Sequence, residues 1–125
     1  MSKITNTKQR PEEVLVKRVV SVLDDLKAEA VTCLDVRHLT SVTDVMIIAN
    51  GRSARHVRAV AAALVERCKD YHYRPMGIEG QDAGQWILVD LGDVVVHVMQ
   101  PTIREHYDLE KLWDIDYLEG AEEAL

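Results

Sequence analysis

The stretch Trp86–Met99, WILVDLGDVVVHVM, decides the fold. Two apolar runs, Trp86–Asp90 and Val94–Met99, flank a short turn in which Gly92 is free to adopt a positive φ. The runs are rich in valine and isoleucine and too short for helices, so they predict a β-hairpin. Little alternation is visible in the second run, which predicts strands covered on both faces at the centre of a sheet.

Three side chains interrupt this apolar hairpin: Trp86, Asp90 and His97. They are candidate functional residues, because an apolar core element has no packing need for them. His97 alternates with its valine neighbours and therefore shares a strand face with Val95 and Met99. A single histidine in that position is typical of a hydrogen-bonded core or interface residue rather than of a metal ligand.

The sequence on either side of the hairpin predicts further helices and strands. Apolar residues at helical spacing indicate a helix over about 12–31, and Ser53 is a suitable N-cap for another. The predicted elements are, in order, the helix 12–31, strands at Thr32–Val36 and Asp44–Ala49, a helix ending near His72, a strand at Arg74–Glu79, the hairpin, a helix at Pro101–Tyr107, and a final turn packed by Leu109, Leu112 and Trp113. This order predicts a single α/β domain over residues 11–113, with a mixed β-sheet packed by helices. A flexible arm (1–10) and an acidic tail (114–125) flank it.

Composition narrows the class of protein. With 125 residues and a hydrophobic fraction of 47%, the chain is long enough for one globular core. No apolar run approaches the roughly 20 residues of a membrane span, and no apolar stretch follows the basic residues at the N-terminus. The two cysteines, Cys33 and Cys68, form no CxxC pair. We therefore expect a cytoplasmic protein with no membrane or zinc site.

The net charge of −6 is unevenly distributed. Residues 77–125 contain two basic and twelve acidic side chains, whereas residues 52–76 contain six basic and two acidic ones. Binding to a phosphate backbone depends on Lys and Arg, so the acidic half favours a basic protein partner over direct recognition of nucleic acid. The alternative, that the charge only keeps the domain soluble, stays open.

The sequence offers little for catalysis. Neither GxxxxGK[ST] nor GxGxxG is present, the five histidines show no metal-binding spacing, and the single DxD, Asp114–Asp116, lies in the tail. We predict no catalytic, metal or cofactor site. Two alternatives remain. One is a nucleotidyltransferase-like enzyme that binds a nucleotide at Gly51–Arg55, before a helix, and the other is a protein that binds RNA through basic residues. Those basic residues are Arg52, Arg55, Arg58, Lys69 and Arg74.

Aromatic residues are scarce: the chain has two Trp, four Tyr and no Phe. Trp and Tyr are common interface anchors, so Trp86 and Tyr107 are candidates for partner binding. The alternative is that both cap the core.

The chain from Leu34 to Trp113 closely resembles the bacterial ribosomal silencing factor family, also called Iojap. Three segments carry the resemblance: LDVRHLTSVTDVMIIANGRSARHV, PMGIEGQDAGQWILVDLGDVVVHVM and REHYDLEKLW. The resemblance implies a fold related to nucleotidyltransferases without their catalytic acidic pair, and a non-enzymatic role. One departure lies at Ala49–Arg55, where family members more often have small hydroxyl residues around the glycine.

The resemblance also implies a partner and a mechanism. Family members bind ribosomal protein fourteen of the large subunit, block joining with the small subunit and damp translation during nutrient limitation or stationary phase. They are also implied to act in late large-subunit assembly, and many are homodimers when free. Trp86 and Tyr107 match the family's partner-binding positions. Glu79, Asp90 and Asp93 are added by the charge argument, and His97 by its place on the strand.

Overall fold

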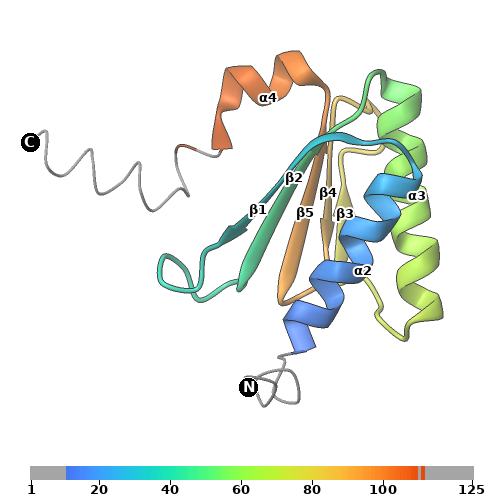
Figure 1. The fold of residues 1–125 in the computed structure, drawn as a ribbon. Helices are drawn as coiled ribbons and strands as arrows, with labels where there is room; N and C mark the ends of the chain where they lie inside the picture. The colour runs from blue at the N-terminus through green and yellow to red at the C-terminus, as the bar shows by residue number, and fades with distance from the viewer. Residues whose placement is uncertain (1–10, 110, 112–125) are drawn as a thin grey trace, which may run out of the picture.

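The computed structural model describes residues 11–109 and 111 and has the element order that the sequence predicts. Figure 1 shows helices and strands interleaved along the chain, which confirms the α/β class. The elements are α2 (Pro11–Asp25), β1 (Glu29–Asp35), β2 (Val45–Asn50), α3 (Ala54–Asp70), β3 (Gly77–Glu79), β4 (Trp86–Asp90), β5 (Val94–Met99) and α4 (Pro101–Tyr107).

The five strands form one mixed sheet in the order β1-β2-β5-β4-β3. β2 and β5 run parallel, and the other neighbouring pairs run antiparallel. The predicted hairpin is present as β4 and β5, with Gly92 at φ 89° in its turn. β5 is the central strand and all six of its residues are buried, as its unbroken valine run predicts.

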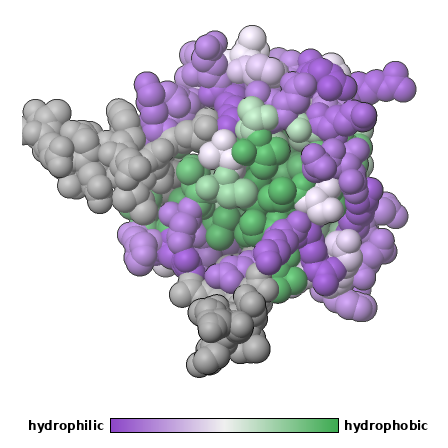
Figure 2. Space-filling view, viewed as in Figure 1, coloured by the Kyte–Doolittle hydropathy of each residue, from purple (hydrophilic) through white to green (hydrophobic). Residues whose placement is uncertain are grey.

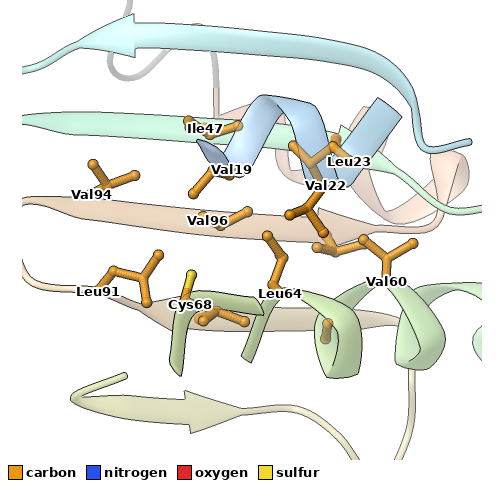
Figure 3. Close-up of a cluster of buried hydrophobic side chains, with 14 of the residues drawn as sticks. Val19, Val22, Leu23, Ile47, Val60, Leu64, Cys68, Leu91, Val94 and Val96 are labelled. Atoms are coloured by element: carbon orange, nitrogen blue, oxygen red, sulfur yellow. The ribbon is translucent and has the colours of Figure 1, made fainter. Parts of the chain in front are cut away.

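Helices α2 and α3 cover one face of the sheet (Figure 1). Their apolar sides and the sheet form the main core, in which Val22, Leu64 and Val96 are completely buried (Figure 3). Helix α4 packs at one end of the opposite face. There Ile103 and Leu109 lie against a smaller buried cluster: Val36, Met46, Ile48 and Met99.

The first helix is shorter than its sequence pattern predicts. α2 ends at Asp25 rather than near residue 31, because the Ala28 N–H turns back to the Leu23 carbonyl oxygen at 2.9 Å while Lys27 takes a positive φ of 63°. Ala30, predicted as helical, lies in β1 with a φ of 51°. Glycine or asparagine usually marks such positions, and neither is present here.

Other boundaries differ less. β3 begins at Gly77 rather than Arg74, after Pro75, whose nitrogen has no hydrogen to donate to a sheet. Leu109 packs against the smaller buried cluster, whereas Leu112, Trp113, the arm 1–10 and the tail 114–125 lie outside the described residues. None of the helices in the described part of the chain is long and apolar enough to cross a membrane.

Candidate partner-binding surface

Sheet register collects most of the predicted site residues on the face opposite α2 and α3. Residues directly opposite one another on neighbouring strands share a face. Glu79 lies opposite Leu88, and Leu88 lies opposite His97. Trp86 and Asp90 are two residues to either side of Leu88, so their side chains leave the sheet on the same face. This face is the candidate partner-binding surface.

Trp86 is joined to His97 across the hairpin. Trp86 pairs with Met99 in the β4–β5 register, which places its ring diagonally over His97. The Trp86 Nε1–H donates a hydrogen bond to His97 Nδ1 at 2.9 Å, and the ring centroids are 5.8 Å apart. Trp86 is half-buried, so one side of the indole is fixed by the sheet while part of it stays accessible.

The hydrogen bond from Trp86 determines the tautomer of His97. Since Nδ1 accepts, the hydrogen of the neutral ring is on Nε2. The His97 side chain is only 5% exposed, and among the described residues its Nε2 has no hydrogen-bond partner. Burial disfavours the charged imidazolium and lowers the pKa of His97 from 6.5 to about 4. His97 is therefore neutral at physiological pH and serves as an acceptor for Trp86.

Tyr107 extends the aromatic cluster from the end of α4. Its ring centroid is 4.9 Å from that of Trp86, at an interplanar angle of 51°, and its side chain is 55% exposed. The ring of His106 lies edge-on to the ring of Tyr107, with 4.9 Å between the ring centroids. The structure thus brings Trp86, His97 and Tyr107 together, although they come from three separate elements.

Arg104 fixes α4, and with it Tyr107, against the sheet. Its guanidinium donates to the Ala30 carbonyl oxygen at 2.6 Å, to Asn50 Oδ1 at 2.9 Å and to Thr32 Oγ1 at 2.9 Å. The side chain is 9% exposed. Sequence analysis missed this residue, because an arginine in a short polar helix is normally exposed and the acceptors named above are distant in sequence.

The acidic candidates are spread over the surface rather than clustered. Glu79 is exposed at the end of edge strand β3. Asp90 is four residues from Trp86, about 13 Å along the strand, and its Oδ1 accepts the Gly92 N–H at 2.9 Å. Asp93 is exposed, and its carbonyl oxygen accepts the N–H groups of Asp44 and Val45. Asp90 and Asp93 therefore also hold the turn.

At the alternative nucleotide site, Gly51–Arg55, the groups that could bind a phosphate already form hydrogen bonds within the protein. Ser53 is the N-cap of α3, as predicted, and accepts the His56 N–H at 3.1 Å. The Arg52 N–H donates to His56 Nδ1 at 2.9 Å, and the Gly51 N–H donates to the Met99 carbonyl oxygen at 2.9 Å. A phosphate would have to displace these bonds.

The basic residues proposed for RNA binding do not act as one free patch. Arg58 donates to the carbonyl oxygens of Gln81 and Asp82, and so holds the loop before β4. Arg52 faces Glu29 at 3.8 Å. Within residues 11–109 and 111, no group of three or more His, Cys, Asp or Glu is placed to hold a metal ion.

Comparison with known proteins identifies the family. Residues 7–124 match the family model described as ribosomal silencing factor during starvation. This chain belongs to the ribosomal silencing factor family. The match runs past both ends of the predicted 11–113 domain.

Individual relatives agree with this assignment. The ribosomal silencing factor of Haemophilus influenzae is 46% identical over 99 residues, which cover 79% of this chain and 97% of that protein. The ribosomal silencing factor of Bacillus subtilis is 36% identical over 102 residues, which cover 82% of this chain and 86% of that protein. A mouse protein named for mitochondrial assembly of the ribosomal large subunit is 38% identical, and this chain covers 44% of it.

Solved structures of similar sequence share the fold. A crystal structure of a Chromobacterium violaceum protein matches with a TM-score of 0.80 and 41% identity, covering 84% of this chain and 87% of that one. One from Bacillus halodurans matches with a TM-score of 0.75 and 37% identity, covering 81% and 94%. The architecture built around the β4–β5 hairpin is thus that of a ribosomal silencing factor fold.

Proposed function

We propose that this member of the ribosomal silencing factor family binds ribosomal protein fourteen of the large subunit and sterically blocks joining with the small subunit. It would thereby repress translation in the cytoplasm during nutrient limitation or stationary phase, without catalysis. We also propose a role in large-subunit assembly, supported by the name of the mouse relative, and a homodimeric free state.

The aromatic cluster supports this proposal most directly. Trp86 is held by the hydrogen bond to His97 and by the ring of Tyr107 before any partner arrives. A half-buried tryptophan with a fixed orientation loses little conformational freedom on binding, and such residues dominate interface energetics. Tyr107 offers an exposed aromatic surface beside it.

The acidic residues are suited to a basic partner. Glu79 and Asp90 leave the same sheet face as Trp86, and Asp93 lies in the turn at its far end. The distance of about 13 Å between Trp86 and Asp90 fits within a standard interface, which covers about 800 Å² on each partner. We expect these carboxylates to speed association and to give it salt dependence, with the anchoring energy coming from Trp86.

Sedimentation with purified ribosomal subunits tests the proposal. The wild-type protein is expected to comigrate with the large subunit alone and to reduce the joined particle. Trp86→Ala is expected to weaken this binding by about 2 kcal/mol, roughly 30-fold. A matched control is Tyr71→Ala, which removes another partly exposed aromatic, at the end of α3.

Two results would contradict the proposal in different ways. If the wild-type protein fails to bind the large subunit, the assignment of partner is wrong. If Trp86→Ala is folded, as judged by circular dichroism, and binds as tightly as the Tyr71→Ala control, the partner stands but the surface is elsewhere. The same experiment with isolated ribosomal protein fourteen distinguishes that protein from other parts of the subunit.

A further inference from the structure

A second candidate surface is an apolar groove between helix α2 and the edge strand β1. It lies on the face of the sheet that α4 does not cover. Two adjoining hollows of about 360 and 510 Å³ share Val16 and Lys17 in their walls. Figure 2 shows this area as a hydrophobic surface bordered by hydrophilic residues. We call it the α2–β1 groove; its apolar side chains are Val16, Val20, Ala28, Val31, Cys33 and Val45.

The backbone of β1 along this groove is available for pairing. The Val36 N–H donates to the Asp44 carbonyl oxygen, and the Val45 N–H points the other way, to Asp93. Backbone groups alternate in direction along an antiparallel strand, so those of Cys33 and Asp35 are directed away from β2. β1 is the last strand of the sheet on this side, and these groups lie at its open edge.

Natural edge strands are protected against another strand by being short, or by proline, lysine or a β-bulge. β1 has such an irregularity only at its start, where the register shifts between Glu29 and Thr32 and Ala30 takes a positive φ. Residues 31–35, VTCLD, contain no proline or lysine, and β1 has seven residues. The opposite edge strand, β3, has only three. Strand addition beside a groove of alternating apolar contacts is a common mode of peptide recognition.

The charges around the groove indicate the chemistry of the occupant. Its charged lining residues are three carboxylates and one ammonium group: Glu13, Asp24, Asp35 and Lys17. The Arg37 guanidinium pairs with the Asp35 carboxylate, and counting it leaves the groove with one net negative charge. A second copy of the chain fits less well, because its own β1, EAVTCLD, contains no Lys or Arg to complement that charge.

We infer that the α2–β1 groove binds an extended, basic segment of a partner protein, added to the sheet as a strand beside β1. Apolar side chains at alternate positions of that segment enter the groove next to Val20 and Val31. A Lys or Arg residue at one of its ends meets the Asp24 carboxylate. This inference concerns a different surface from the Trp86 cluster and stands independently of the proposed function.

A synthetic peptide of sequence KVTVTVTK, blocked at both ends, tests the inference. Titrated into the ¹⁵N-labelled full-length protein, it is expected to shift the amide signals of Val31, Cys33 and Asp35, with a Kd below about 1 mM. The charge-reversed peptide EVTVTVTE is expected to bind at least about tenfold more weakly.

Two variants separate strand addition from other contacts. Cys33→Pro removes the outward N–H but spares the hydrogen bonds to β2, and is expected to weaken binding at least about tenfold relative to the matched Cys33→Ser. Val20→Lys adds a like charge to the groove and is expected to weaken it similarly. It serves in place of Cys33→Pro if that variant does not fold.

Three outcomes overturn the inference. The basic peptide leaves the β1 amide signals unchanged; or it binds the folded groove variants as tightly as Cys33→Ser; or the protein is a dimer that Cys33→Pro dissociates, which makes a second copy the occupant. None of these outcomes depends on ribosome binding, so failure here and failure of the proposed function are distinguishable.

Discussion

Protonation of His97 is expected to make the stability of this protein depend on pH. Burial lowers the pKa of His97 to about 4 in the folded protein, against 6.5 for an unperturbed histidine. Between these values the unfolded chain takes up a proton that the folded protein does not. The free energy of unfolding therefore falls as the pH is lowered from about 6.5 to about 4.

The size of the effect follows from the shift in pKa. Each unit corresponds to 1.36 kcal/mol, so a fall from 6.5 to about 4 amounts to about 3 kcal/mol. That is a large part of the roughly 5–15 kcal/mol that stabilises a domain of this kind. The same protonation would compete with Trp86 for Nδ1, because an imidazolium has no acceptor.

Urea unfolding between pH 4 and pH 7.5 measures this dependence. His97→Gln cannot titrate, so the stability difference between wild type and this variant isolates the contribution of His97 from that of the carboxylates. We expect the difference to change by about 3 kcal/mol across the window. His38→Gln, at an exposed histidine, is expected to follow the wild type. Parallel curves for wild type and His97→Gln would refute the reasoning.

Two further substitutions test how the surface is held in place. Arg104→Lys is expected to lower the free energy of unfolding by about 2 kcal/mol, because one ammonium group cannot reach the acceptors on both β1 and β2. Arg55→Lys, at an exposed arginine, is the control. Equal stability of the two variants in urea would contradict this role of Arg104. Gly80→Ala is expected to lower the free energy of unfolding by more than about 2 kcal/mol, because φ is +93° and the new Cβ would lie 2.0 Å from the Trp86 carbonyl oxygen. Gly77→Ala is the control: no atom lies within 4 Å of its new Cβ, so its stability in thermal unfolding should match that of the wild type.

Much of the fold could be predicted because local pattern and tertiary structure agree in the hairpin. The unbroken valines of β5 fit a strand buried on both faces, and Gly92 takes the positive φ of the turn. The end of α2 could not be predicted in the same way. Lys27 and Ala30 adopt left-handed conformations that their side chains do not signal, and a backbone hydrogen bond to Leu23 closes the helix instead.

The candidate surface was predictable in part for the same reason. Once the hairpin register is fixed by its short turn, Trp86 must lie opposite Met99 and diagonal to His97. The hydrogen bond that orients the indole, and the position of Tyr107 over it, depend on tertiary contacts. The latter rests on Arg104, whose acceptors at residues 30, 32 and 50 are brought together only by folding.

The two faces of the β4–β5 hairpin therefore have different roles, one in the core and one in the candidate partner-binding surface. Ile87, Val89 and Val96 face the helices and hold the domain together, whereas Trp86 and His97 face the other way. The division is incomplete, because His97 is as buried as a core residue and keeps one nitrogen without a partner in the described structure. An unpaired buried donor costs about 1–3 kcal/mol. The same His97 ring supplies the acceptor that orients Trp86. A change that stabilises the sheet by replacing His97 would therefore also remove the hydrogen bond that holds the proposed binding residue in place.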